Sequence, residues 1–318
     1  MTIVSDYYFA GLSDELLGKI RKAAPGIEIT SAYLDTVTAD ELIGSEIVYG
    51  RVPPQILRDL KNLKWIHLAS AGANGLTDLS LYPNHSVILT KSSGTFGIPI
   101  SEHIIGMMIA LSRHFGQWYE NMDSSRWNAV WSGYREIYES NVLVLGVGDL
   151  GTEVCWRLSN FGCRVTGFRK DTSIPHELFN DIRPLSRLHE SLPDADYIII
   201  CLPGTVETEK LIGREEFALM KNSAVIINVG RGMIIDTDAL VEALYANKIG
   251  GAGLDVTDPE PLPPDHPLWK APNVLITPHV SAGSDRNNER RVDIFCDLLR
   301  RYISGQELHN KVDFTAGY

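Results

Sequence analysis

The chain has 318 residues, of which 44% are hydrophobic and 22% are charged, and its formal net charge at pH 7 is -11. A single hydrophobic core rarely grows beyond about 250 to 300 residues, so two domains are expected. The acidic balance excludes nucleic acid as the main partner, because polyanion binders need a basic face. The longest apolar run, 104–111, is far shorter than the ~20 residues of a membrane span, which excludes a transmembrane helix.

The N-terminus and the cysteines indicate the compartment. Residues 1–9 lack both a basic region and a small-residue cleavage site, so no signal peptide is expected and the location is expected to be cytoplasmic. The four cysteines and nine histidines show no metal-ligand spacing, which predicts free thiols and no metal site.

The first 95 residues predict an α/β domain. Strands are expected at 46–49, 65–69 and 86–89, and helices at 14–23, 40–43 and 54–60. A capping box, in which Thr38 and Glu41 satisfy free amides of the first turn, marks the beginning of the second helix.

A long helix, 100–114, follows and is apolar on nearly every side, which is typical of a helix buried between layers or domains. The next segment, 117–138, is rich in Trp, Tyr and Ser without clear periodicity and is interpreted as a connecting or interface segment.

A second α/β series predicts a doubly wound parallel sheet. Its six apolar runs are 142–145, 165–168, 197–201, 224–229, 251–255 and 274–277. A last helix, 286–303, lies beyond the sixth run and is expected to return to the first domain.

A glycine motif stands at the first of these strands. Gly146, Gly148 and Gly151 form a GxGxxG turn between the strand 142–145 and a helical segment. Such a turn permits close approach of a pyrophosphate to free amides at the helix N-terminus. Strand, glycines, helix and second strand stand in the required order, which predicts a dinucleotide site and hence a nicotinamide-dependent oxidoreductase.

The end of the second strand decides between NAD and NADP. An NAD site usually presents an acidic residue there, whereas this chain has Arg169 and Lys170. A guanidinium binds a 2′-phosphate bidentately, so NADP(H) is favoured and NAD(H) stays possible. In the alternative interpretation both cations are solvated, and Asp171 reaches the ribose.

Three further residues follow predicted strands at the carboxyl edge, where open α/β sheets bind ligands: Arg231, Glu260 and His279. Reduction of a 2-oxo acid needs a cation for the carboxylate, a proton donor for the carbonyl oxygen, and a partner that keeps the donor protonated. Arginine, histidine and glutamate meet these needs. Each residue alone has a structural explanation; together with a nucleotide site they predict a catalytic site.

Four segments resemble, in order and spacing, the signature segments of the D-isomer-specific 2-hydroxyacid dehydrogenases: 143–151, 228–236, 254–262 and 275–282. In the first domain, residues 70–73 look like that family's substrate-carboxylate loop and residues 99–102 like the beginning of its interdomain helix. This chain departs from the family pattern at Asn74, which leaves the substrate open, and at the basic cofactor position.

The resemblance implies a role for each matching residue. Arg231 would bind the substrate carboxylate and carbonyl oxygen, His279 would protonate that oxygen, and Glu260 would hold His279. Asp255 would bond the nicotinamide carboxamide. Backbone amides of the first domain would receive the substrate carboxylate: Ala71, Gly72 and Ala73. The remaining cofactor contacts would be Asp149, Leu150, Cys201, Pro203, Val229 and Gly230.

The family also implies two Rossmann-like domains. Residues 1–98 and 285–318 would form a smaller, flavodoxin-like substrate domain, and 99–284 the dinucleotide-binding domain. Family members are typically dimers joined through the coenzyme domain. The expected partner is a small 2-oxo or 2-hydroxy acid, for instance glyoxylate or hydroxypyruvate. A formate or phosphite dehydrogenase, and a dinucleotide-sensing corepressor or scaffold on the same fold, are the alternatives.

Overall fold

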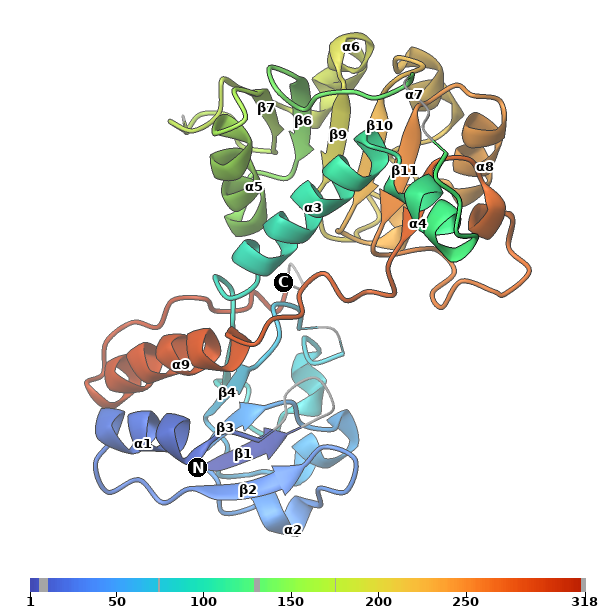
Figure 1. Cartoon of the computed structure of the whole chain (residues 1–318). Helices are drawn as coiled ribbons and strands as arrows, with labels where there is room; N and C mark the ends of the chain where they lie inside the picture. Colours follow the sequence, from blue (N-terminus) through green and yellow to red (C-terminus); the bar gives the residue numbers. More distant parts are fainter. Residues whose placement is uncertain (6–10, 74, 129–131, 175, 316–318) are drawn as a thin grey trace. The chain divides into compact units, whose positions relative to one another are not determined.

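The computed structural model describes residues 1–5, 11–73, 75–128, 132–174 and 176–315. The chain divides into two compact units (Figure 1). The smaller unit comprises Met1–Phe96 and Ser284–Tyr318, and the larger unit comprises Gly97–Gly283. All strand pairs within the two sheets are parallel, which confirms the predicted α/β class.

The smaller unit contains a five-stranded sheet in the order β2-β1-β3-β4-β5, the flavodoxin-like order. Its strands are β1 (Thr2–Ser5), β2 (Thr30–Tyr33), β3 (Ile47–Gly50), β4 (Trp65–Leu68) and β5 (Ile88–Lys91). Sequence patterns do not predict β1 and β2. The first has only two apolar residues, and the second is an edge strand in which only Ala32 is buried.

Helices cover both faces of this sheet. On one face lie α1 (Asp14–Ala23) and α9 (Asn287–Ile303), whose apolar sides form one core with β3 and β4 (Figure 1). On the other face, α2 (Ala39–Leu42) and the segment Pro54–Asp59 contribute to a second core. The helix predicted at 54–60 is a 3-10 helix, Pro54–Asp59, with 3.2 Å hydrogen bonds that span three residues at each end.

The larger unit contains a seven-stranded sheet in the order β12-β11-β10-β9-β6-β7-β8. Its strands are β6 (Asn141–Leu145), β7 (Arg164–Phe168), β8 (Asp181–Arg183), β9 (Tyr197–Ile200), β10 (Val225–Asn228), β11 (Gly251–Leu254) and β12 (Val274–Ile276). The strand order reverses between β6 and β9, so the switch point of a doubly wound sheet lies there. The sequence does not predict β8, a three-residue edge strand that is only half-buried.

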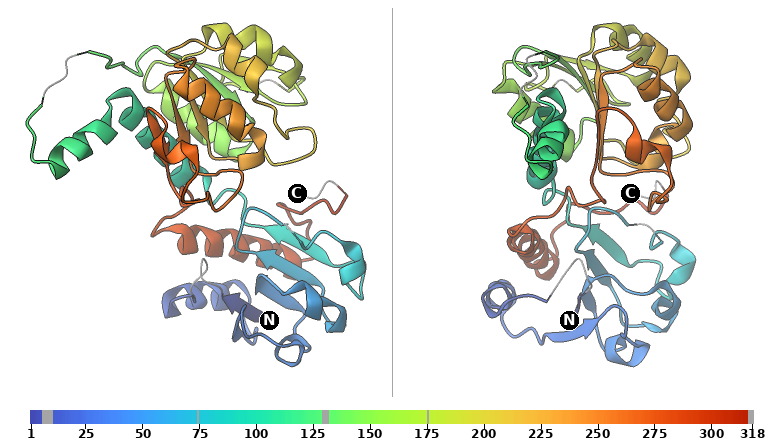
Figure 2. Two further views of the ribbon diagram at one scale, coloured as in Figure 1. Left: turned by 90° about the vertical axis from the view of Figure 1, so that its right-hand side faces the viewer. Right: turned by 45° about the vertical axis from the view of Figure 1, so that its right-hand side comes forward.

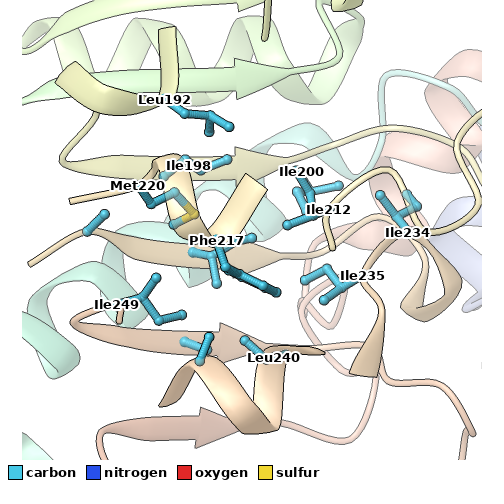
Figure 3. Packing of buried hydrophobic residues seen from close by; sticks show 14 of the residues in the cluster. Leu192, Ile198, Ile200, Ile212, Phe217, Met220, Ile234, Ile235, Leu240 and Ile249 are labelled. Atoms are coloured by element: carbon cyan, nitrogen blue, oxygen red, sulfur yellow. The ribbon is translucent and has the colours of Figure 1, made fainter. Parts of the chain in front are cut away.

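Two layers of helices enclose this sheet. On one face α3 (Gly97–Ser112) packs against α5 (Asp149–Ser159), while α6 (Leu188–Ser191), α7 (Arg214–Leu219) and α8 (Thr237–Tyr245) belong to the other face. The right-hand view of Figure 2 shows α3 and α8 on opposite sides of the sheet. Between them, β9 sends Ile198 and Ile200 into the core with α7 (Figure 3), and Tyr197 and Ile199 into the core with α3. The strand therefore reads as a continuous apolar run.

The segment after α3 contains a helix whose apolar face is not buried. Phe115–Asp123 forms α4, although none of its residues is buried. Its apolar residues Phe115, Trp118, Tyr119 and Met122 recur at helical spacing, and the interpretation of 117–138 as a segment without periodicity overlooked this stripe because it begins before residue 117. Within the described residues, no helix is long and apolar enough to cross a membrane, and no group of three acidic, His or Cys side chains could hold a metal ion.

Candidate active site

The candidate residues of the larger unit gather at one edge of its sheet. The loops that follow β6, β9, β10, β11 and β12 all leave from the carboxyl ends of neighbouring parallel strands. These loops carry the glycine turn, Cys201 to Pro203, Arg231, Glu260 and His279. The topology thus assembles residues from five separate stretches of sequence, as expected for the ligand edge of an open α/β sheet.

Two glycines of the turn are required by close backbone contacts. Gly146 has φ +110°, and a Cβ there would lie 2.8 Å from the carbonyl oxygen of Cys201. A Cβ at Gly151 would overlap the carbonyl oxygen of Gly146, which the first turn of α5 approaches. A side chain at either position would therefore force the turn away from β9 or α5 away from the turn.

Gly148 plays a different part, because a Cβ there would meet no atom within 4 Å. Gly148 is the N-cap of α5 and makes no side-chain cap among the described residues, so the space beside the N-cap is open. The carboxylate of Asp149 lies near Gly97 of α3, where an added Cβ would be 3.0 Å from its Oδ2. An open backbone at a helix N-terminus fits a pyrophosphate, with the backbone amides as donors.

Arg169 stands at the carboxyl end of β7 as a half-buried cation. Its backbone amide donates a hydrogen bond to the backbone carbonyl of Arg183 at 3.1 Å. In contrast, Nε and Nη2 of its guanidinium are buried without a hydrogen-bond partner among the described residues. Such unmet donors are costly unless an acceptor binds them. The strand places Arg169 on the same face as Gly167, which packs on Val147 of the glycine turn.

The two residues that follow Arg169 interact with other side chains of the unit. Lys170 is exposed and forms an ion pair with Glu207, in the loop after β9. Asp171 accepts hydrogen bonds from the hydroxyl and amide of Ser173, at 2.6 and 2.9 Å. These bonds, more than the nearby Arg169, hold the pKa of the exposed Asp171 carboxyl below its usual value. The geometry of this segment therefore favours Arg169 over Asp171 as the residue that is open to a ligand.

The loop after β10 positions Arg231. Asn228, which is buried, donates from its side chain to the carbonyl of Arg231 at 2.9 Å and accepts from the amide of Gly230 at 3.0 Å. Val229 is buried beside it, while Arg231 is exposed and its Nη1 donates to the carbonyl of Gly230 at 2.6 Å. The turn is thus fixed at its base, and its cation is at the surface of the unit.

Glu260 and His279 meet although they follow different strands. Oε1 of Glu260 lies 2.7 Å from Nδ1 of His279, and both side chains are nearly half exposed. Because the ionised carboxylate accepts a hydrogen bond from Nδ1–H, the other ring nitrogen, Nε2, is left for a ligand. This arrangement can deliver a proton at a fixed position.

Asp255 holds the loop that carries His279. The carboxylate is buried and accepts hydrogen bonds from the hydroxyl of Thr277 at 2.6 Å, the amide of Val280 at 2.9 Å, and the amide of Ser281 at 3.1 and 3.2 Å. Burial raises the pKa of Asp255, but these hydrogen bonds outweigh it and leave the pKa below its usual value. The predicted contact of Asp255 with the nicotinamide stays a prediction.

The remaining cofactor residues line the same edge. Cys201 is partly buried, and burial raises the pKa of its thiol to about 12, so the thiol stays protonated at neutral pH. Pro203 is exposed, and its carbonyl accepts from the hydroxyl of Thr208 at 2.8 Å. Leu150 packs against the core on the α3 side. Contacts of these residues with a dinucleotide stay predictions.

The predicted carboxylate loop belongs to the smaller unit. Residues 70–73 follow β4 at the carboxyl edge of that sheet, where Ser70 Oγ donates to the carbonyl of Gly72 at 2.7 Å. In the described part of the chain, the amides of Ala71, Gly72 and Ala73 have no acceptor. Asn74 lies outside the described residues.

Sequence patterns miss three residues that the structure places around the site: Asn228, Thr277 and His103. Asn228 and Thr277 lie at strand ends, where a polar residue after a buried run is a usable signal. His103 lies within an apolar helix, and only its polarity there could have marked it.

The phosphate-binding geometry and the acid–base pair share one sheet edge, and this combination defines the class of protein: an oxidoreductase that uses a nicotinamide dinucleotide. Residues 105–281 match the family model described as "D-isomer specific 2-hydroxyacid dehydrogenase, NAD binding domain". The chain belongs to this family, as the resemblance of its signature segments predicted, and is accordingly an NAD(P)-dependent 2-hydroxyacid dehydrogenase.

Three individual proteins illustrate what this chain is similar to. A glyoxylate/hydroxypyruvate reductase B from Pectobacterium carotovorum is 31% identical over 87% of this chain and 86% of the relative. A structure from Xanthobacter autotrophicus, described as a D-isomer specific 2-hydroxyacid dehydrogenase in complex with NADPH and MES, is 27% identical with a TM-score of 0.82, covering 100% of this chain and 99% of the other. A D-3-phosphoglycerate dehydrogenase from Methanocaldococcus jannaschii is 28% identical over 93% of this chain, which spans only 57% of that relative.

Proposed function

We propose that this chain reduces a short 2-oxo acid with NADPH and releases the D-2-hydroxy acid, with glyoxylate and hydroxypyruvate as candidate substrates. The observation that carries the proposal is the 2.7 Å contact between Glu260 and His279 at the carboxyl edge of the sheet. The reductase and dehydrogenase names of the relatives support the reaction type.

The residues would divide the reaction as follows. When bound, NADPH supplies the hydride. His279 gives a proton from Nε2 to the carbonyl oxygen, and Glu260 stabilises the protonated ring through Nδ1. Arg231 presents the cation that a substrate carboxylate needs. The amides of Ala71 to Ala73, which have no acceptor in the described part of the chain, are proposed by themselves as donors to a carboxylate.

The test is turnover with a panel of short, branched and aromatic 2-oxo acids, using NADPH and NADH, with the product resolved by chiral chromatography. We expect reduction of the short acids to the D-product. Tight NADPH binding without turnover of any 2-oxo acid would favour a dinucleotide sensor or scaffold. Oxidation of formate or phosphite would favour a formate or phosphite dehydrogenase instead.

The preference for NADP(H) over NAD(H) is proposed from Arg169. Its buried Nε and Nη2 have no partner among the described residues, and a 2′-phosphate offers the oxygens that a guanidinium binds bidentately. Lys170, exposed and paired with Glu207, is the proposed second cation.

Arg169→Asp tests this preference. We expect the ratio of kcat/KM for NADPH to that for NADH to fall at least about tenfold, the equivalent of roughly 1.4 kcal/mol. Arg187→Asp is the matched control, because Arg187 is an exposed arginine of the same unit that pairs with Glu190. An unchanged ratio in Arg169→Asp refutes the assignment.

A homodimer is proposed from the surface of α4 and the residues after it. Tyr119 and Met122 are 68% and 73% exposed and Trp127 is fully exposed, which is unusual for large apolar side chains close together in sequence. We expect light scattering to give the mass of a dimer for the wild type and of a monomer for the double variant Tyr119→Lys/Met122→Lys. A monomeric wild type contradicts the proposal.

The cytoplasmic location stays a prediction.

A further inference from the structure

One histidine of the larger unit points at the site from a helix that the reaction scheme does not use. His103 lies in α3, and its side chain is 24% exposed. Its Nε2 lies 3.0 Å from the hydroxyl oxygen of Thr277 and 3.9 Å from Oδ1 of Asp255. The hydroxyl of Thr277 in turn lies 2.6 Å from that same Oδ1. A side chain of α3 is therefore connected to the carboxylate beneath the His279 loop.

The chemistry of these groups fixes the direction of the hydrogen bonds. The pKa of Asp255 is held below its usual value, so its carboxylate is ionised near neutral pH and only accepts. The Thr277 hydroxyl then donates its single hydrogen bond to Asp255. Thr277 can consequently only accept from His103, which must carry its proton on Nε2.

The chain of bonds continues to His279. Oδ1 of Asp255 also accepts the amide of Val280 at 2.9 Å, and the backbone carbonyl of Asp255 accepts the amide of His279 at 2.8 Å. His279 itself has φ +54°, an uncommon backbone conformation for a non-glycine residue that its surroundings must hold. The position of the proton donor therefore depends on how Asp255 is oriented.

We propose that His103 is a positioning residue for the catalytic loop: its Nε2 proton orients the Thr277 hydroxyl, which orients the Asp255 carboxylate, which holds His279 in place. The inference rests on the proposed function of His279 as the proton donor. His103 touches neither substrate nor cofactor in this scheme and acts only through Thr277 and Asp255.

Two pairs of variants test the connection. His103→Phe keeps a ring but removes the donor, and His103→Gln restores an N–H. Thr277→Val removes the hydroxyl at nearly constant volume, and Thr277→Ser restores it. We expect His103→Phe and Thr277→Val to lower kcat about 3- to 10-fold, the effect of losing one hydrogen bond, with the Kd of NADPH within about twofold. The restoring variants should recover most of the loss.

The double variant and a control separate positioning from general damage. Because both residues act through one chain of bonds, His103→Phe/Thr277→Val should lose no more kcat than Thr277→Val alone. His189→Phe, which removes an exposed histidine paired with Glu216 at 2.7 Å in the same unit, should leave kcat unchanged. Additive losses, or equal losses of kcat and NADPH affinity, overturn the proposal.

A measurement on the wild type does not depend on turnover. Nitrogen-15 NMR of labelled histidines, with the His103 signal identified by its absence in His103→Gln, reports which ring nitrogen carries the proton. We expect Nε2 to be protonated, and a ring protonated only on Nδ1 overturns the proposal. If no 2-oxo acid is turned over but Nε2 is protonated, the proposed function fails while the hydrogen-bond chain stands.

Discussion

Asn228 and Arg231 are joined across one turn by a 2.9 Å hydrogen bond from the buried side-chain amide of Asn228 to the carbonyl of Arg231. The other end of the same amide group accepts from Gly230 at 3.0 Å, so two backbone groups of the turn depend on one side chain. The cation of Arg231 is exposed, but the backbone that carries it is fixed from within the unit.

Asn228→Ala is predicted to destabilise the protein by about 1 to 3 kcal/mol, because it leaves buried polar groups of the turn unpaired. It should also raise KM for the 2-oxo acid, since Arg231 loses its fixed position. Urea unfolding and steady-state kinetics measure the two effects. Asn160→Ala removes an exposed side-chain bond to Trp156 and should change stability by less than about 0.5 kcal/mol. Equal effects of the two substitutions contradict the prediction.

Glu260→Gln is predicted to lower kcat about 5- to 10-fold, because a hydrogen bond to a neutral amide stabilises the protonated His279 less than one to a carboxylate. NADPH affinity should change little. The exposed Glu190, which pairs with Arg187 in the same unit, provides the control Glu190→Gln. A variant with wild-type kcat would show that Glu260 does not support the proton donor.

Substitutions at Gly148 and Gly151, two of the three glycines of the turn, are predicted to cause different defects. Gly148→Ala should stay folded with unchanged stability, because its Cβ meets open space, but should weaken NADPH binding at least about tenfold by filling that space. Gly151→Ala should instead lose about 1 to 3 kcal/mol of stability, since its Cβ overlaps the backbone of Gly146. Urea unfolding and fluorescence titration distinguish them; tight NADPH binding by Gly148→Ala rules out the phosphate assignment.

The buried carboxylate of Asp255 predicts a dependence of stability on pH. Its pKa in the folded state is below the usual 3.8, so the ionised form stabilises the folded state above that pH and this contribution is lost as the pH falls below it. The difference in unfolding free energy between wild type and Asp255→Asn should therefore be largest at neutral pH and should narrow in acid. A difference in unfolding free energy that grows as the pH falls would contradict this prediction.

Sequence patterns account for most of the fold because its signals are local. The apolar runs of β6, β9 and β10, the glycine turn and the all-apolar α3 each carry their own evidence. The two edge strands left no such signal, because β2 has one buried residue and β8 has none. Their formation depends on neighbours that are distant in sequence.

The sequence singles out candidate site residues one by one but not the hydrogen bonds that join them. Strand ends pointed to Glu260 and His279, and the family resemblance assigned their roles. The sequence could not indicate that the Asp255 carboxylate accepts hydrogen bonds from the loop that carries His279. Nor could it indicate that His103 of α3 contacts Thr277 in that loop. Those relationships depend on the packing of α3 over the carboxyl end of β11 and β12, which no local pattern encodes.

The most direct test of the central claim is the initial rate of NADPH oxidation by glyoxylate or hydroxypyruvate, measured for the wild type and for His279→Ala. We expect turnover by the wild type and a loss of kcat of about 100- to 10,000-fold in the variant, the usual range for a general acid, with NADPH still bound. A variant that retains near wild-type turnover would contradict the assignment of His279 as the proton donor.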